Sequence, residues 1–323
     1  MQESFISTQH LSVGYSHKKH QYLVQTNLEL VLRKGELVCL IGPNGSGKST
    51  LLRSLSGLQN IPDGAVFIRG KNLNRLSRRE IAQQIALVLT DRINIENASV
   101  HDIVSLGRQP YTNWWGKISD DDSAKVFEAI KTVHLEQKQH RFMHELSDGE
   151  RQRVMIAKAL AQDTAIILLD EPTAHLDLPN RVEIMLLLHR LAHQTKKAIL
   201  LSTHELDLAL QAADKIWLMD NQKGIVGGIP EDLVLNGSFN NVFQNEHYTF
   251  NTANGNFSMN YPLDKEATVF GEKTRLYWTL RALARIGYRA VPNAVTQIEI
   301  TDTSWKTGKQ EFRHIENLLN YLS

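Results

Sequence analysis

The chain has 323 residues, of which 42% are hydrophobic and 22% charged, and its formal net charge is +1. This composition excludes a disordered protein and argues against a surface built to coat nucleic acid. A single cysteine, Cys39, excludes an internal disulfide and any site with several cysteine ligands. No apolar stretch approaches the ~20 residues of a membrane span, so we expect a soluble, cytoplasmic protein of about two domains.

The first third of the chain predicts strands, because runs rich in β-branched and apolar residues alternate with polar and glycine residues. These strands are expected at 5–13, 26–32, 37–41 and 65–69. From about 99 to 144 the pattern becomes helical, with apolar residues three to four positions apart. Helices at 147–162 and 179–194 then alternate with continuous apolar strands at 165–169 and 198–202. This alternation predicts an α/β fold whose parallel sheet is covered on both faces.

The composition changes after about residue 243, which suggests a first domain over 1–246 and a second unit over 247–323. Residues 248–259 alternate around Asn254-Gly255, a strong hairpin signal. A helix at 274–286 and a strand at 295–301 are expected next. A last helix is expected to place these residues on one face: Phe312, Ile315, Leu318, Leu319 and Leu322. The second unit is therefore predicted to be a small α+β domain.

A glycine-rich run fits the pattern G-x-x-x-x-G-K-[ST], between a strand ending at Ile41 and a helix starting near Lys48. Its members are Gly42, Pro43, Asn44, Gly45, Ser46, Gly47, Lys48, Ser49 and Thr50. The glycines would let backbone N–H groups turn inward around an anion, and Lys48 would reach the outer phosphates. The hydroxyl of Ser49 would bind Mg²⁺. The alternative is a glycine turn without a ligand; the context favours a nucleoside triphosphate site.

An apolar strand at 166–169 delivers Asp170 and Glu171 at its carboxyl end. Ligands of open α/β sheets bind at that end. Asp170 would suit Mg²⁺, and Glu171 would orient or deprotonate an attacking water. Such an acidic pair can also be a solvated strand end, and it gains weight only beside the phosphate loop.

Ser147 and Glu150 have the spacing of a capping box that starts a helix. Their surroundings, Leu-Ser-Asp-Gly-Glu followed by a basic, alanine-rich helix, resemble the LSGGQ signature motif of ATP-binding cassette (ABC) ATPases. The two interpretations are compatible, because a capped helix start is a good phosphate clamp.

The resemblance covers residues 1–246 and implies a P-loop core with an antiparallel β subdomain and a helical subdomain at about 91–146. It implies that Tyr15 stacks on adenine and that Asp177 lies in the D-loop at a dimer interface. It also implies that His204 contacts the γ-phosphate, and that Ser147, Gly149 and Glu150 meet ATP bound to an opposite chain. Read singly, Tyr15 could be a core aromatic and His204 a hydrogen-bonded loop histidine.

Two residues depart from the family pattern. Thr90 stands where the family has glutamine; it offers a shorter hydroxyl contact to Mg²⁺ or water. Asp148 stands where the signature has glycine, and a carboxylate there would repel a phosphate unless it points away. We therefore assign phosphate contact to Ser147 and to the backbone of Gly149.

His189 and His193 are four residues apart on a predicted helix, which suits two zinc ligands. No third ligand lies within sequence reach, so we interpret the pair as a solvated face. Cys39 is interpreted as a small buried apolar residue.

The family arrangement implies ATP and Mg²⁺ as cofactors and a head-to-tail dimer of two copies of the chain. Residues 105–116 (Ser-Leu-Gly-Arg-Gln-Pro-Tyr-Thr-Asn-Trp-Trp-Gly) resemble the G-R-x-P stretch of importers of the iron–siderophore, haem or cobalamin type. Trp114 and Trp115 could instead serve packing. The resemblance implies transmembrane permease partners, an external substrate-binding protein acting indirectly, no nucleic acid, and a place on the cytoplasmic side of the inner membrane.

The competing class is a soluble ABC ATPase of the repair or translation type. Repair types carry a long coiled-coil insertion before the signature, whereas here Lys48 and Ser147 are 99 residues apart. Translation types usually carry two cassettes. The unit at 247–323 lies outside the core resemblance, and regulation or plain accessory packing are its two interpretations.

Overall fold

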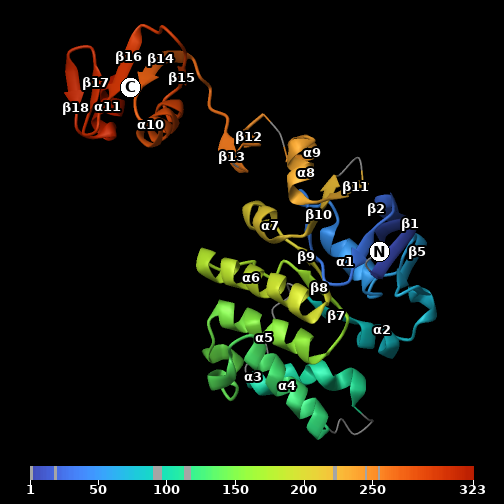
Figure 1. Cartoon of the computed structure of the whole chain (residues 1–323). Coiled ribbons are helices and arrows are strands. Elements are labelled where there is room, and N and C mark those ends of the chain that lie inside the picture. Colours follow the sequence, from blue (N-terminus) through green and yellow to red (C-terminus); the bar gives the residue numbers. More distant parts are fainter. Residues whose placement is uncertain are drawn as a thin grey trace. The chain divides into compact units, whose positions relative to one another are not determined.

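The structure is a computed structural model that describes residues 3–17, 20–89, 97–112, 118–220, 224–243, 246–253 and 255–323 (Figure 1). It divides into two compact units. The first comprises Met1–Gln244 with Thr252–Asn256, and the second Asn245–Asn251 with Phe257–Ser323. Within the described ranges, no helix has both the length and the apolar character needed to cross a membrane.

The first unit is built on a six-stranded sheet in the order β11-β10-β4-β9-β8-β7. Its strands are β4 (Leu37–Ile41), β7 (Ile85–Val88), β8 (Ile166–Asp170), β9 (Ala198–Ser202), β10 (Lys215–Asp220) and β11 (Gly224–Gly228). Only the edge strand β11 runs antiparallel to its neighbour. Every residue of β4, β8 and β9 is buried, because both faces of the sheet are covered. The predicted α/β fold is confirmed.

An antiparallel sheet forms the second layer, in the order β2-β1-β5-β6 with β3 on β1. Its strands are β1 (Ser4–His17), β2 (His20–Leu28), β3 (Val31–Arg33), β5 (Asp63–Ile68) and β6 (Lys71–Asn72). The expected single strand at 26–32 is wrong. Asn27 adopts a left-handed φ of +54°, and β2 and β3 pair with different parts of β1.

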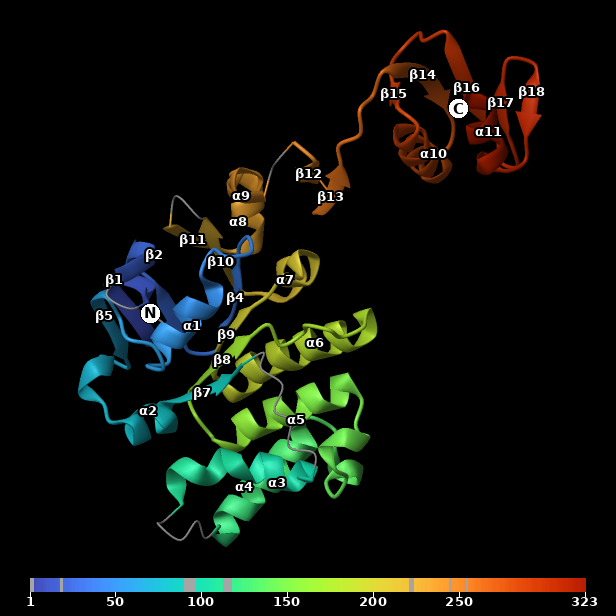
Figure 2. The same cartoon turned by 180° about the vertical axis from the view of Figure 1, so that it is seen from behind.

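Helix α1 (Lys48–Leu55) shares one core with both sheets (Figure 2). Alternate residues of β4, Val38 and Leu40, join Leu51 and Leu55 of α1 in that core, as a period of two requires. Helix α6 (Leu178–Thr195) contacts β4 and β9 from the opposite face. Cys39 points to that face and is fully buried, which confirms its predicted structural role.

A helical subdomain extends from the sheet. It contains α3 (Val100–Ser105), α4 (Asp120–Thr132) and α5 (Asp148–Ala161), with short turns η2 (Leu106–Tyr111), η3 (Glu136–Lys138) and η4 (Met143–Glu145). Capping boxes at Ser99 and Ser119 start α3 and α4, and both helices pack against α5. Thr90, Trp114 and Trp115, for which the sequence predicts roles, lie outside the described residues.

Shorter elements complete the first unit and lead out of it. They are η1 (Leu73–Arg75), α2 (Arg78–Gln84), α7 (Leu206–Ala212), α8 (Pro230–Leu235) and α9 (Ser238–Phe243). A two-stranded hairpin follows, β12 (Tyr248–Asn251) with β13 (Asn256–Met259), where the Asn-Gly signal predicts one.

The second unit contains a five-stranded sheet in the order β15-β14-β16-β17-β18. Its elements are β14 (Lys265–Phe270), α10 (Lys273–Arg285), β15 (Tyr288–Ala290), β16 (Thr296–Ile300), β17 (Trp305–Thr307), β18 (Gln310–Phe312) and α11 (Ile315–Leu322). Its separate core is formed by Ala267, Leu283, Ile298 and Leu318. Phe312 packs against this core from β18 and not from the last helix, so its predicted place on that helix is wrong.

Candidate functional site

The phosphate loop joins the end of β4 to the start of α1. Gly45 and Gly47 have φ of +78° and +103°, a region that is open to glycine and strained for other residues. A Cβ on Gly47 would also come within 2.4 Å of Val24. Gly47 is the N-cap of α1 and supplies no side-chain hydrogen bond to the helix start. The first N–H groups of α1 are therefore available to an anion.

Lys48 lies buried beneath this loop. Its Nζ donates to the carbonyl oxygens of Gly42 at 2.9 Å and Pro43 at 3.1 Å. Burial lowers the pKa of the Lys48 ammonium, and the nearby carboxylates of Glu171 and Asp170 oppose part of that shift. Two of the three ammonium protons are engaged by the loop, which leaves a third donor for a phosphate oxygen.

Asp170 and Glu171 are joined through Ser202, which the sequence analysis did not single out. The hydroxyls of Ser49 and Ser202 donate to Oδ1 of Asp170 at 3.0 and 2.7 Å. The hydroxyl of Ser202 also accepts the N–H of Glu171 at 2.9 Å. Because Asp170 and Ser202 are paired across β8 and β9, one serine can fix both acidic residues.

The side chains of Glu171 and His204 contact each other beyond the ends of β8 and β9. Nε2 of His204 lies 2.7 Å from Oε1 of Glu171, and both side chains are partly open to solvent. Glu171 has a φ of +49°, which is uncommon for a residue with a side chain. A carboxylate held in this way can orient a water molecule or accept its proton.

Gln25 is a buried positioning residue that the sequence analysis missed. Its amide Nε2 donates to the carbonyl oxygen of Asp220 at 2.8 Å and to that of Ser46, in the phosphate loop, at 3.4 Å. The hydroxyl of Ser46 is buried, and among the described residues it has no hydrogen-bond partner. No sequence signal separates this glutamine from others in a strand.

Tyr15 is exposed over 53% of its surface, so it is not a core aromatic. It stacks on Tyr22 of the neighbouring strand, with ring centroids 5.4 Å apart. Its ring is accessible to a planar ligand.

Ser147 and Glu150 form the predicted capping box at the start of α5. The hydroxyl of Ser147 accepts the N–H of Glu150 at 3.3 Å, and Glu150 accepts the N–H of Ser147 at 3.0 Å. Lys138 forms an ion pair with Glu150, which lowers the pKa of that carboxyl. Asp148 pairs with Arg151 at 3.3 Å, so its charge is partly balanced within the helix.

Asn180 contacts both Asp177 and Gly149. Asp177 is the N-cap of α6, and its Oδ1 accepts the side-chain amide of Asn180 at 2.6 Å. A Cβ on Gly149 would come within 2.5 Å of Oδ1 of Asn180. The start of α5 is thus packed directly on the start of α6. A pocket of about 500 Å³ beside this contact is lined in part by Ser147 and Asn180.

Arg108 is a buried anchor of the helical subdomain. It pairs with Asp122 at 2.7 Å, donates to the carbonyl oxygen of Ala161 at 2.7 Å and lies over the ring of Tyr111. Hydrogen bonds from the Ser119 hydroxyl and from Arg108 lower the pKa of Asp122 to about 2. In the G-R-x-P stretch, this arginine therefore holds the subdomain together.

His189 and His193 lie on a partly exposed face of α6. Asp214, which directly precedes β10, brings a third ligand-type side chain to the pair. All three side chains are only partly exposed. Asp214 lies 21 residues after His193 in the sequence, so spacing along the chain does not predict it as a ligand. The fold places it beside the C-terminal half of α6, directly before β10.

Comparisons with known proteins identify the family of this chain. The family model "ABC transporter" matches residues 25–174, and the model "Iron ABC transporter C-terminal domain" matches residues 264–323. A probable siderophore transport system ATP-binding protein of Bacillus subtilis is 38% identical over 240 residues, covering 74% of this chain and 86% of its own. The chain belongs to the ABC transporter ATP-binding proteins.

Two other relatives are informative. The achromobactin transport ATP-binding protein of Dickeya dadantii is 37% identical and covers 74% of this chain and 87% of its own. A dimeric ATP-binding cassette solved in a post-hydrolysis state with ADP and phosphate has a TM-score of 0.61 and 27% identity, over 70% of this chain and 98% of its own.

This ABC transporter protein is therefore an ATPase that binds nucleotide through its cassette. The phosphate loop and the carboxyl ends of β8 and β9 bring together the expected residues Lys48, Ser49, Asp170, Glu171 and His204. The remaining expected residues lie on other elements: Tyr15 on β1, Ser147 and Gly149 at the start of α5, and Asp177 at the start of α6.

Proposed function

We propose that this chain is the ATP-hydrolysing subunit of an importer for iron–siderophore complexes. The observation that carries the proposal is the match of residues 264–323 to the iron ABC transporter C-terminal domain, on a cassette whose relatives include siderophore transport proteins. An uptake system for haem or cobalamin is the related alternative. A solved transporter assigned to the metal-chelate type, 28% identical with a TM-score of 0.64, supports the same class.

In this proposal ATP lies against the phosphate loop, residues 42–50, with its adenine stacked on Tyr15. The N–H groups at the start of α1 and the ammonium of Lys48 hold the β- and γ-phosphates. Glu171 orients the attacking water and takes up its proton, while His204 holds Glu171 in place and contacts the γ-phosphate. Catalysis then comes mainly from positioning and charge stabilisation.

Mg²⁺ would be held by Ser49 and Asp170. Their oxygens are 3.0 Å apart, and hydroxyl and carboxylate oxygens are the donors that this hard cation prefers. When bound, the ion neutralises charge on the phosphate oxygens. Ser202 keeps the Asp170 carboxylate in place through its own hydrogen bond. Thr90 remains a further candidate outside the described residues.

The second half of each ATP site is proposed to come from another copy of the chain. Ser147 and the Gly149 backbone would meet the γ-phosphate of ATP bound to that copy, with Glu150 holding the helix start and Asp177 at the interface. The dimeric form of a related cassette supports this arrangement. The cassette would span residues 1–246, and residues 247–323 would form an accessory or regulatory domain.

The chain is further proposed to act at the cytoplasmic side of the cell membrane through transmembrane permease subunits. The helical subdomain would receive a cytoplasmic helix of the permease, and an external binding protein would deliver the iron complex. Relatives that are import ATP-binding proteins support this assembly.

Iron uptake in the source organism tests the proposal. Deletion of the gene should abolish uptake of ⁵⁵Fe-labelled siderophore, and the wild-type chain should restore it. Glu171→Gln should not restore it, whereas Asp207→Asn, an exposed change in α7, should. Siderophore-iron uptake that persists without the chain would contradict the proposal. If only haem or cobalamin uptake were lost, the cargo would be haem or cobalamin instead.

A further inference from the structure

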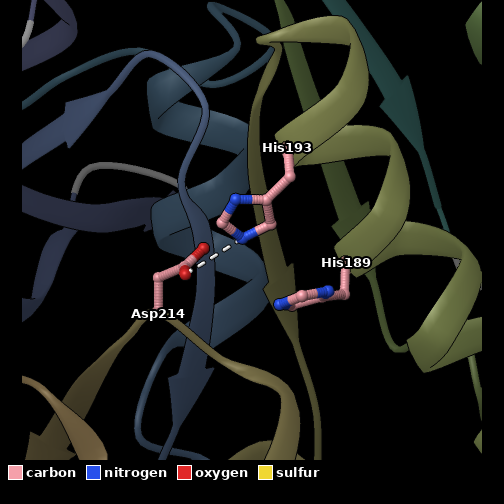
Figure 3. Close-up of side chains that lie close together, drawn as sticks. All are labelled: His189, His193 and Asp214. Carbon is pink, nitrogen blue, oxygen red and sulfur yellow. Dashed lines mark hydrogen bonds and ion pairs between the residues drawn. The ribbon is translucent and has the colours of Figure 1, made fainter.

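A second group of ligand-type side chains lies away from the phosphate loop. His189 and His193 project from the C-terminal half of α6 toward Asp214, at the entry to β10 (Figure 3). One ligand atom from each residue lies within 4.8 Å of the other two. Figure 3 shows both imidazole rings and the carboxylate turned toward one shared space.

The two histidines are presented on one helix face by their spacing. Residues four apart in an α-helix lie one above the other, and here the ring centroids are 4.4 Å apart. Nε2 of His193 is 3.1 Å from Oδ1 of Asp214. Two ligands around a tetrahedral Zn²⁺ lie ~3.3 Å apart, so one ligand pair already has the required separation.

Asp214 is held in place by the backbone. Its Oδ2 accepts the N–H of Leu37, the first residue of β4, at 2.7 Å, while Oδ1 faces His193. A carboxylate whose second oxygen is fixed in this way resembles the supported ligands of metal centres, in which an outer hydrogen bond orients the ligand. Asp214 and Leu37 lie at the amino ends of β10 and β4. The phosphate loop follows the carboxyl end of β4, so this group lies at the opposite ends of the strands.

The donor set selects the kind of ion. Two imidazole nitrogens and one carboxylate oxygen suit Zn²⁺ and its first-row neighbours, whereas Mg²⁺ and Ca²⁺ prefer oxygen alone. Three protein ligands leave the fourth position of a tetrahedral ion to water. We propose that His189, His193 and Asp214 bind a divalent transition-metal ion of the Zn²⁺ class, which ties α6 to the sheet independently of the ATP site.

Binding is tested on the full chain, free of nucleotide. Zn²⁺ affinity is measured by competition with a chromophoric chelator, and Co²⁺ is used as a spectroscopic probe of the coordination. The wild type should bind Zn²⁺ and show visible Co²⁺ bands of a low-coordinate site. His189→Gln, His193→Gln and Asp214→Asn should each weaken Zn²⁺ binding at least about tenfold. Asp214→Asn keeps an oxygen for the N–H of Leu37, so it isolates the ligand charge.

His140→Gln, at an exposed histidine outside the cluster, is the matched control and should bind Zn²⁺ like the wild type. Thermal unfolding gives a second readout: Zn²⁺ should raise the melting temperature of the wild type and of His140→Gln, and not that of the three cluster variants. Equal Zn²⁺ affinity in wild type and cluster variants would overturn the proposal. So would a wild type that binds no Zn²⁺ at micromolar concentration, since the group would then be a hydrogen-bonded pair only.

Discussion

Nε2 of His204 lies 2.7 Å from Oε1 of Glu171, just beyond the ends of two neighbouring parallel strands. The contact holds the carboxylate near Lys48 of the phosphate loop, where we propose that it meets the attacking water. The two residues are 33 positions apart in sequence, so the sheet register brings them together.

Replacing the Glu171 carboxylate by an amide should separate binding from hydrolysis. Glu171→Gln should bind ATP and lose on the order of 10²–10⁴ in hydrolysis rate, because an amide cannot accept the water proton. Nucleotide binding by equilibrium dialysis and phosphate release measure the two effects. Asp207→Asn should leave both unchanged, and wild-type turnover in Glu171→Gln would remove Glu171 from the reaction.

Removing the Ser49 hydroxyl should weaken the binding of Mg²⁺. Ser49→Ala should raise the Mg²⁺ concentration for half-maximal hydrolysis on the order of tenfold, because one oxygen ligand beside Asp170 is lost. Chelation of Mg²⁺ should abolish hydrolysis in the wild type. Ser54→Ala is the control on the same helix, since the buried Ser54 hydroxyl has no partner among the described residues. An unchanged Mg²⁺ profile in Ser49→Ala would contradict the assignment.

The contact between Gly149 and Asn180 should show as coupling between two substitutions. Gly149→Ala should lower the free energy of unfolding by about 1–3 kcal/mol, because its methyl group would overlap the Asn180 side chain. Adding Asn180→Ala should recover part of that loss, although Asn180→Ala alone removes a hydrogen bond to Asp177. Urea unfolding of all four proteins measures the coupling, and strictly additive effects would exclude it.

Asp122 should make the helical subdomain sensitive to acid. Its folded pKa of about 2 lies below the ~3.9 of an unfolded aspartate, so its ionised form stabilises the fold above pH 4. This contribution is lost as the pH falls from about 4 to 2. The urea midpoint of the wild type should therefore fall more steeply over this range than that of Asp122→Asn.

Asp121→Asn, at the exposed neighbour in the same helical turn, is the control for Asp122 and should retain the steep fall. Parallel pH profiles for the wild type and Asp122→Asn would show that the pair with Arg108 does not carry the pH dependence.

The parts of the site that are local in sequence could be predicted. The phosphate loop and the capping box of Ser147 and Glu150 rest on residues within a few positions of each other, and backbone geometry gives their spacing a physical meaning. The apolar run of β8 likewise predicted where Asp170 would stand.

Residues that act through long-range pairing could not be predicted in this way. Ser202 and Gln25 look ordinary in sequence, and their roles depend on the register of β8 with β9 and on the folding of β2 against the phosphate loop. Asp214 reaches His193 only because β10 enters the sheet beside α6. The break between β2 and β3 has the same origin, since pairing with β1 overrode the continuous strand pattern.

The left-handed backbone of Glu171 limits how the stability of this protein can be increased. A residue with a side chain at a φ of +49° lowers the free energy of unfolding by roughly 1–2 kcal/mol, and a glycine there would avoid that loss. Glycine would also remove the carboxylate we assign to the attacking water. Selection for a more stable fold and selection for faster turnover therefore oppose each other at this one position, and stabilising mutations compatible with activity must be sought elsewhere.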